Sequence, residues 1–138
     1  MRRRFAFLPA ASVAALLACT AAAAPRPMVE QDLYRLTWVA DPQISPDGAR
    51  VAFVRVSIDS AADEYRTSIW VTESSGGAPR PLTSGTRDGQ PRWSPDGKTL
   101  AFLRGAEGKP AQICLLPMTG GEATPLTRLK GGASSPRL

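Results

Sequence analysis

The 138-residue sequence contains no histidine, only two cysteines, and few aromatic side chains, which make up 7% of it. Without histidine, no Ser-His-Asp or Cys-His catalytic unit can be assembled within the chain. Two cysteines alone do not supply a zinc site of the usual Cys/His kind. Charged residues at 21% and apolar residues at 43% exclude a disordered charged tail and a membrane bundle. We therefore expect one small domain without catalytic residues, cofactor or metal.

The excess of positive charge, a net +5, is concentrated at the N-terminus. Three arginines at positions 2–4 precede a mostly apolar run over 5–18, and four alanines follow at 21–24. A charged, an apolar and a small-residue region in this order are typical of a secretory signal peptide. We predict that residues 1–24 form such a signal and that the protein is exported, to the periplasm or the medium of a bacterium. Removing them leaves a net charge of +2, which does not indicate nucleic-acid binding.

Cys19 lies within this segment, after Leu16-Leu17-Ala18, which resembles a bacterial lipoprotein processing box with an unusual leucine before the alanine. Two interpretations stay open. Cys19 is lipidated and attaches the protein to a membrane, or it is an ordinary apolar residue removed with the signal. In both cases Cys114 lacks a partner for an intrachain disulfide, and we predict that it is a small, buried, apolar residue.

An internal repeat organises the rest of the chain. Residues 42–53 return 49 positions later as residues 91–102, and both copies contain Ser-Pro-Asp-Gly. Residues 76–83 return as 120–127, and both contain Gly-Gly and Leu-Thr. A period of about 40 to 50 residues is typical of propeller blades. Residues 136–138 match the start of a third copy, so we expect the chain to be truncated, with further blades after Leu138 in the parent protein.

Each copy predicts a four-stranded antiparallel meander. In Ser-Pro-Asp-Gly, proline presets φ for a turn, aspartate bonds a nearby amide, and glycine accepts the positive φ that closes a hairpin. Alternating apolar residues then predict second strands over 50–56 and 99–104 and third strands over 68–72 and 112–116. Each Leu-Thr pair ends an outer strand.

The predicted fold is therefore all-β: a partial β-propeller in which tandem sheets bury their faces against one another. Its blades span 42–83 and 91–127, and the start of the next blade spans 136–138. A lead-in segment, 25–41, precedes them. Within that segment residues 30–36 predict a helical turn that docks on the first blade through two leucines, Leu33 and Leu36.

The region from Asp32 to Leu138 resembles the N-terminal propeller part of a prolyl oligopeptidase-family serine peptidase, in the dipeptidyl aminopeptidase and acylaminoacyl peptidase branch. The resemblance is carried by Asp32-Leu33 with Leu36, by Val39-Ala40-Asp41-Pro42, and by the repeated Ser-Pro-Asp-Gly and Gly-Gly motifs. It implies a C-terminal α/β-hydrolase domain that bears Ser, Asp and His. The propeller would cover this domain and admit only short peptides.

The chain itself has no Gly-x-Ser-x-Gly motif, so no catalytic residue of the family carries over, and we expect it to be inactive alone. TolB-like envelope propellers share the Trp-Ser-Pro-Asp-Gly repeats. The alternative function is therefore a non-enzymatic propeller that binds cell-envelope proteins.

Two other groups of residues are candidate sites. Three acidic residues, Asp59, Asp63 and Glu64, resemble a calcium-binding group, but they lack EF-hand spacing and favour a solvated hairpin tip. Three tryptophans, Trp38, Trp70 and Trp93, resemble a ligand platform, but their strand positions favour core packing.

Overall fold

The computed structural model describes residues 26–137, so the predicted signal peptide and Cys19 lie outside the described residues. A short helix, α1 (Glu30–Leu33), precedes two four-stranded antiparallel sheets. Blade 1 has the order β1 (Thr37–Ile44), β2 (Arg50–Asp59), β3 (Glu64–Glu73) and β4 (Arg80–Pro81). Blade 2 has the order β5 (Asp88–Trp93), β6 (Thr99–Ala106), β7 (Lys109–Pro117) and β8 (Thr124–Pro125).

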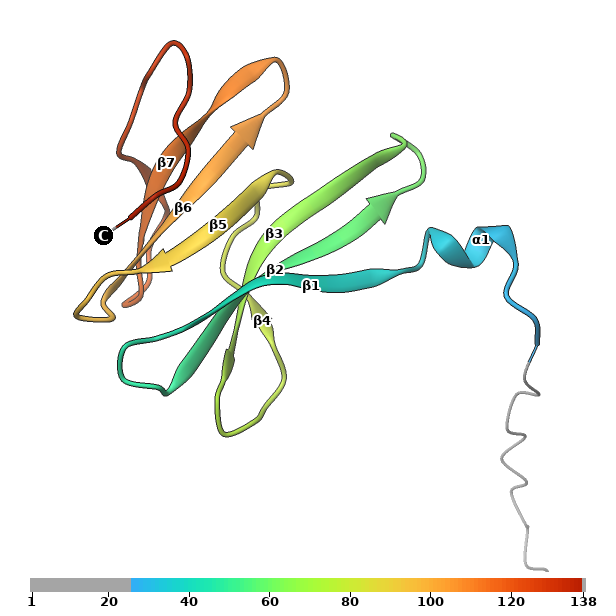
Figure 1. The fold of residues 1–138 in the computed structure, drawn as a ribbon, viewed down its shortest axis with the longest axis horizontal. Coiled ribbons are helices and arrows are strands. Elements are labelled where there is room, and N and C mark those ends of the chain that lie inside the picture. The colour runs from blue at the N-terminus through green and yellow to red at the C-terminus, as the bar shows by residue number, and fades with distance from the viewer. Residues whose placement is uncertain (1–25, 138) are drawn as a thin grey trace, which may run out of the picture.

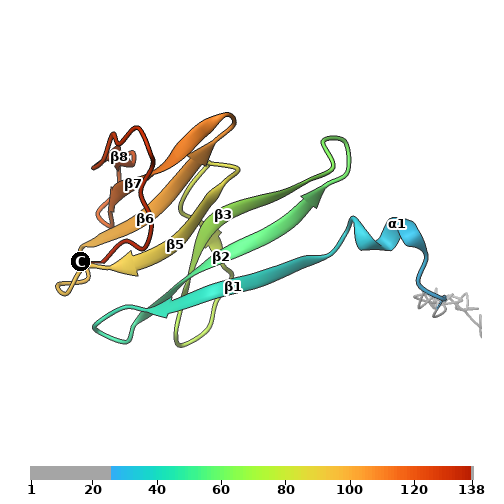
Figure 2. The same cartoon turned by 45° about the horizontal axis from the view of Figure 1, so that its top comes forward.

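The two sheets lie side by side, and α1 projects away from them (Figure 1; Figure 2). β5 of blade 2 contacts β1, β2 and β3 of blade 1. The all-β prediction of two tandem four-stranded meanders is confirmed. No strand follows β8 among the described residues, so the start of a third blade stays a prediction.

The Ser-Pro-Asp-Gly hairpins form as their chemistry predicts. The Ser45 hydroxyl donates to Asp47 Oδ1 at 2.6 Å, and the same carboxylate oxygen accepts the Ala49 N–H at 3.0 Å. Gly48 has a φ of 71°, which only glycine adopts without strain. The turn between β5 and β6 repeats each of these contacts through Ser94, Asp96 and Lys98.

The threonine of each Leu-Thr pair forms a hydrogen bond to the third strand of its blade. The Thr83 hydroxyl accepts the Ile69 N–H at 3.0 Å, and the equivalent Thr127 accepts the Ile113 N–H at 2.9 Å. These hydroxyls satisfy main-chain donors of the third strand that the two-residue outer strands β4 and β8 do not reach.

The hydrophobic core lies between the blades. It contains Ala52 and Ile69 of blade 1 together with four residues of blade 2, which are Leu100, Phe102, Cys114 and Leu116. Cys114 is 2% exposed, as predicted for a small apolar residue, and burial raises the pKa of its thiol. The blades thus stabilise each other by burying their facing sheets.

Several boundaries differ from those expected. β1 begins at Thr37, so blade 1 includes residues 37–41, which were expected in the lead-in segment. β2 and β3 continue in register to the pair Asp59–Glu64, well beyond the predicted strand ends. At the outer end of this hairpin, charged residues interrupt the apolar alternation from which strands are predicted.

The predicted docking of the lead-in helix is seen only in part. α1 is a single turn, and Leu33 lines a groove together with Ile58 and Tyr65 of blade 1. Leu33 and Leu36 nevertheless remain 47% and 46% exposed. The helix also has local contacts: Arg26 pairs with Asp32 at 2.6 Å, and the Asp32 carboxylate accepts the Val29 N–H at 2.9 Å.

Candidate functional site

The inner strands β1 and β5 share a backbone irregularity. The register shifts between Ala40 and Gln43 in β1 and at the equivalent place in β5. At these points Asp41 and Gln90 adopt left-handed φ angles of 45° and 52°. Residues other than glycine take up this conformation at a cost of about 1 kcal/mol or more. In β1 the bulge places Asp41 beside Arg92 of blade 2, and in β5 the Gln90 side-chain oxygen accepts the Ser135 N–H at 3.2 Å.

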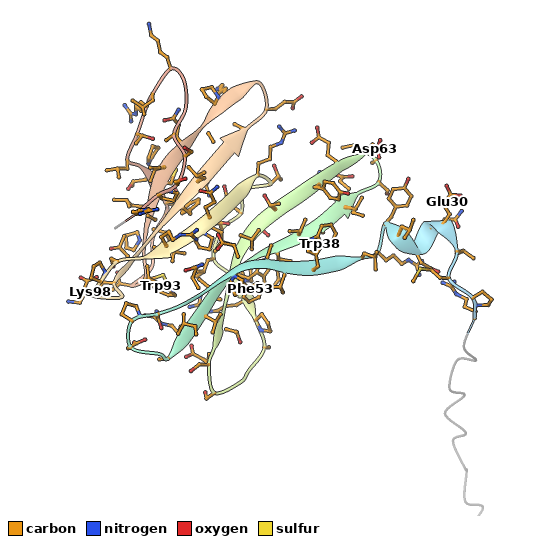
Figure 3. The ribbon with its side chains drawn as sticks, in the orientation of Figure 1. Glu30, Trp38, Phe53, Asp63, Trp93 and Lys98 are labelled. Carbon is orange, nitrogen blue, oxygen red and sulfur yellow. The ribbon has the colours of Figure 1, made fainter. Side chains whose placement is uncertain are left out.

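At this bulge polar contacts join the two inner strands. Arg92 Nη1 of β5 donates to Asp41 Oδ2 of β1 at 2.8 Å, and Gln43 Nε2 donates to the other carboxylate oxygen at the same distance. The Trp93 indole N–H donates to the main-chain oxygen of Gln43 at 3.0 Å, and Figure 3 shows Trp93 at this junction. The Asp41 and Arg92 side chains are about one-third exposed, so the pair is accessible to a polar ligand.

A second ion pair lies deeper in the junction. The Asp88 carboxylate is fully buried and accepts two parallel hydrogen bonds, from Arg104 Nε and Nη2, both at 2.9 Å. This bidentate bond raises the pKa of Arg104. A Cβ at Gly85 would lie 2.3 Å from the Asp88 carboxylate, so only glycine permits this approach.

Arg104 lines a cavity of about 520 Å³ between the outer parts of the two blades. Blade 1 contributes its Leu-Thr region to the wall, and Glu122 and Leu116 come from blade 2. The Arg104 guanidinium is already engaged by the Asp88 carboxylate, so it reaches this cavity as part of an ion pair.

Two kinds of site can be checked directly in the chain, a histidine-dependent catalytic unit and a metal site. The full sequence has no histidine, and residues 26–137 contain no group of three or more His, Cys, Asp or Glu side chains placed to hold a metal ion. Sequence reasoning listed no catalytic, cofactor or metal residue, and it missed the Asp41–Arg92 and Asp88–Arg104 pairs. The repeat offset aligns Asp41 with Gln90 and Asp88 with Val39, so neither pair recurs as a motif.

Two of the three acidic residues of the β2–β3 hairpin are engaged with arginines. Asp59 forms an ion pair with Arg66, and Glu64 accepts two hydrogen bonds from Arg87 at 2.8 Å. Asp63 lies at the hairpin tip, as Figure 3 shows. The three carboxylates do not converge on one cation position.

The tryptophans divide between core and surface. Trp93 packs against the core, whereas Trp38 is 41% exposed and meets Tyr65 edge to face at 5.6 Å. Trp70 is half-buried beneath the Arg55 guanidinium, 4.6 Å from its ring centre. The prediction of core packing is confirmed for Trp93 and wrong for Trp38, and Trp70 lines an open groove with Trp38 outside the core cluster.

Within residues 26–137 no helix has the length and apolar character required to cross a membrane. No protein-family model matches the sequence.

Two four-stranded meanders packed face to face, with inner strands in contact and short outer strands, define a β-propeller segment. The chain is 42% identical over 106 residues to the uncharacterized peptidase YuxL of Bacillus subtilis (strain 168), which covers 76% of this chain and 16% of that protein. It is 33% identical over 107 residues to dipeptidyl-peptidase 5 of Porphyromonas endodontalis, covering 76% of this chain and 15% of that protein.

Among solved structures, an acylaminoacyl peptidase in complex with a chloromethyl ketone has a TM-score of 0.62 and 25% identity over 74% of this chain and 16% of that chain. The propeller domain of the Trilobed protease from Pyrococcus furiosus has a TM-score of 0.55 and 26% identity over 66% of this chain and 28% of that chain. The predicted resemblance is confirmed: the blades are similar to propeller segments of peptidases. The chain spans about one-sixth of the length of the curated relatives that it matches.

Proposed function

We propose that the chain is the N-terminal propeller part of an exported serine peptidase. In the full protein this propeller lies against a C-terminal α/β-hydrolase domain and restricts access to short peptides. The chain alone is inactive, because a hydrolase of this kind needs a histidine that the sequence lacks.

The observation that carries the proposal is the 42% identity to a protein named as a peptidase, sustained over 106 residues. Fold similarity alone would not suffice, since one propeller architecture serves many functions. TolB from Acinetobacter baumannii has a TM-score of 0.50 and 22% identity, which shows a shared fold only. The binding function is thus the weaker of the two candidates.

In this proposal the inner strands β1 and β5 line the passage to the hydrolase domain. They contact each other, whereas no contact links β4 and β8 among the described residues, so the blades diverge outward as in a propeller. The accessible Asp41–Arg92 pair lies at this inner edge. Its two charges suit the polar backbone and charged ends of a short peptide.

Export rests on the arrangement of charged, apolar and small residues over 1–24. If Cys19 is lipidated, the protein is attached to a membrane through that residue. Mass spectrometry of the product from an exporting bacterial host distinguishes a lipidated Cys19 from a cut near Ala24.

The coding sequence that follows Leu138 in the source genome tests the proposal. We expect further blades and then a hydrolase domain with a Gly-x-Ser-x-Gly motif, in the same frame or after a frameshift. Further blades followed by a stop codon, without such a domain, would favour the envelope-binding alternative.

A further inference from the structure

The backbone bulge of the inner strands has a third copy near the end of the chain. Asp41 and Gln90 adopt left-handed φ angles of 45° and 52°, and Ser135 adopts the same conformation with a φ of 52°. A proline follows each of these residues, and Pro91 and Pro136 are both fully buried. The Gln90 side-chain oxygen accepts the Ser135 N–H at 3.2 Å, so the third bulge lies beside the second. The residue after each proline therefore leaves the backbone at an equivalent point.

The three residues that follow these prolines line one open groove. The groove has a volume of about 370 Å³, and its walls include Gln43, Arg92 and Arg137. Ile44 and Trp93, each the next residue of its inner strand, add an apolar part to the same walls. Consecutive repeats thus bring one side chain each to a single space, and two of the three are arginines.

The charge around this groove is positive. Among the described residues, the charged side chains that line it are both arginines. A third guanidinium, that of Arg50, lies over the Trp93 ring at 5.0 Å from its centre. Two nearby carboxylates do not offset this charge fully, because Asp41 is paired with Arg92 and Asp47 is held within its own hairpin turn. The groove therefore favours an anionic ligand.

Arg92 is held in an orientation that suits a carboxylate. Its Nη1 donates to Asp41 Oδ2 at 2.8 Å and to the main-chain oxygen of Pro91 at 2.7 Å. Within residues 26–137 its Nε and Nη2 have no hydrogen-bond partner, and the side chain is 35% exposed. Arg104 uses this same pair of nitrogens to hold both oxygens of Asp88, at 2.9 Å each. The free edge of Arg92 can hold a ligand carboxylate in the same bidentate way.

We propose that this groove binds the carboxylate of a short peptide. The Nε–Nη2 edge of Arg92 binds both carboxylate oxygens, and the exposed Arg137 guanidinium supplies a second positive charge. Ile44, which is 69% exposed, and Trp93 contact the side chain of the residue that carries the carboxylate. The inference rests on the proposed function for the choice of peptides as ligands, but the binding itself is a property of this chain.

The test measures peptide binding by nuclear magnetic resonance on the purified chain. The Trp93 indole N–H reports on the groove, because it donates to the Gln43 main-chain oxygen at 3.0 Å. N-acetyl-trialanine is titrated once with a free C-terminal carboxylate and once as the C-terminal amide. We expect a saturable shift of the indole signal with the free acid and at least about tenfold weaker binding of the amide. No binding of the free acid, or equal affinity for the amide, would overturn the proposal.

Two further ligands identify the source of the carboxylate. A peptide amide with an internal glutamate carries its carboxylate on a side chain, and sodium acetate carries one without a peptide. Binding of the glutamate peptide would support the carboxylate site and identify a side chain as a second source. Acetate should bind more weakly than the free-acid peptide, because it lacks a side chain for Ile44 and Trp93 to contact. Equal affinity for acetate would overturn the choice of a peptide as the ligand.

Variants test the two arginines separately. Arg92→Gln and Arg137→Gln should each weaken binding of the free-acid peptide about tenfold. Arg137→Gln is the cleaner test, since Arg92→Gln also removes the ion pair with Asp41. Arg80→Gln, at an exposed position of the outer strand β4, is the matched control and should bind as the wild type does.

Circular dichroism checks that each variant folds. Unchanged binding by both groove variants, or an equal loss in the control, would contradict the site. The outcome is independent of the coding sequence after Leu138. Carboxylate binding by this chain without a hydrolase domain downstream would therefore leave the inference standing while the proposed peptidase function fails.

Discussion

The two blades have the same strand order, but the equivalent arginines Arg55 and Arg104 have different partners. In blade 2, Arg104 forms a bidentate pair with the buried Asp88. In blade 1, Val39 stands at the position of Asp88, and Arg55 stacks on Trp70, where blade 2 has Cys114. Arg104 also lies over an aromatic ring, 5.1 Å from the centre of Phe102, and both arginines are partly exposed. The difference therefore lies in the acidic partner: the fully buried Asp88 carboxylate needs a cation, whereas Val39 does not.

Residues at equivalent positions of the two repeats can also have different surroundings. Phe53 and Phe102 occupy equivalent positions, yet only Phe102 is enclosed on its outer side by another blade. Substitutions at equivalent positions therefore measure what the junction adds. The stability predictions below apply to urea unfolding.

The largest difference is expected between the two phenylalanines. Phe102→Ala removes a fully buried ring from the core and should lower the free energy of unfolding by about 4 kcal/mol. Phe53→Ala should cost about 2 kcal/mol, since the groove beside it is open to solvent. Equal losses at both positions would show that the junction adds nothing to the packing of blade 2.

The buried ion pair comes next. Asp88→Ala leaves Arg104 without its partner and should cost about 2 kcal/mol, below the range for fully buried pairs because Arg104 is 34% exposed. The matched Val39→Ala, at a position that is 57% exposed, should change stability by less than about 0.5 kcal/mol. If Asp88→Ala proved as mild as Val39→Ala, the pair would not contribute to the junction.

The threonine hydroxyls should show a smaller contrast. Thr83→Val removes the acceptor of the Ile69 N–H in a buried place and should cost about 1 kcal/mol. Thr127→Val, at the more exposed copy, should cost about half as much, because water can replace the hydroxyl. A larger loss at Thr127 than at Thr83 would show that burial does not set the cost of losing these hydroxyls.

The smallest effect concerns pH and should be alike in both blades. The hydroxyls of Ser45 and Ser94 donate to Asp47 and Asp96, and these bonds lower the pKa of both carboxyls below 3.8. A lowered pKa in the folded state stabilises the protein above the unfolded value, and that contribution is lost as the pH falls below about 4.

Asp47→Asn and Asp96→Asn should therefore each flatten the acid limb of a stability–pH curve by a similar small amount. Urea midpoints measured from pH 2 to 6 give this curve. A variant whose stability instead depends more steeply on acid pH would show that these turns do not hold their carboxylates in the charged form.

Local chemistry made the repeated elements predictable from sequence. Proline, aspartate and glycine at set spacing encode the hairpin turns, and Phe53 and Phe102 mark the alternating strands. The repeat itself predicted that two sheets would pack face to face. The resemblance to a peptidase propeller rested more on Asp32-Leu33 and Val39-Ala40-Asp41-Pro42 than on these turns, which TolB-like propellers share.

What sequence reasoning missed depends on contacts between distant residues or on backbone strain. Asp88 pairs with Arg104 across neighbouring strands, and only folding reveals that this pair is buried. Asp41 adopts a left-handed φ before a proline, and its residue type does not predict this conformation. Leu33 is apolar, which suggested that it docks on the first blade. The local sequence does not show which residues lie near it in space, and it remains 47% exposed.

The central claim is that this chain is a non-catalytic propeller part of a peptidase, and its own activity tests that claim most directly. The purified chain should be incubated with fluorogenic dipeptide amides and, separately, with a fluorophosphonate probe that labels active serines. We predict no release of fluorophore above the buffer rate and no labelling. Saturable cleavage that the probe abolishes would contradict the account.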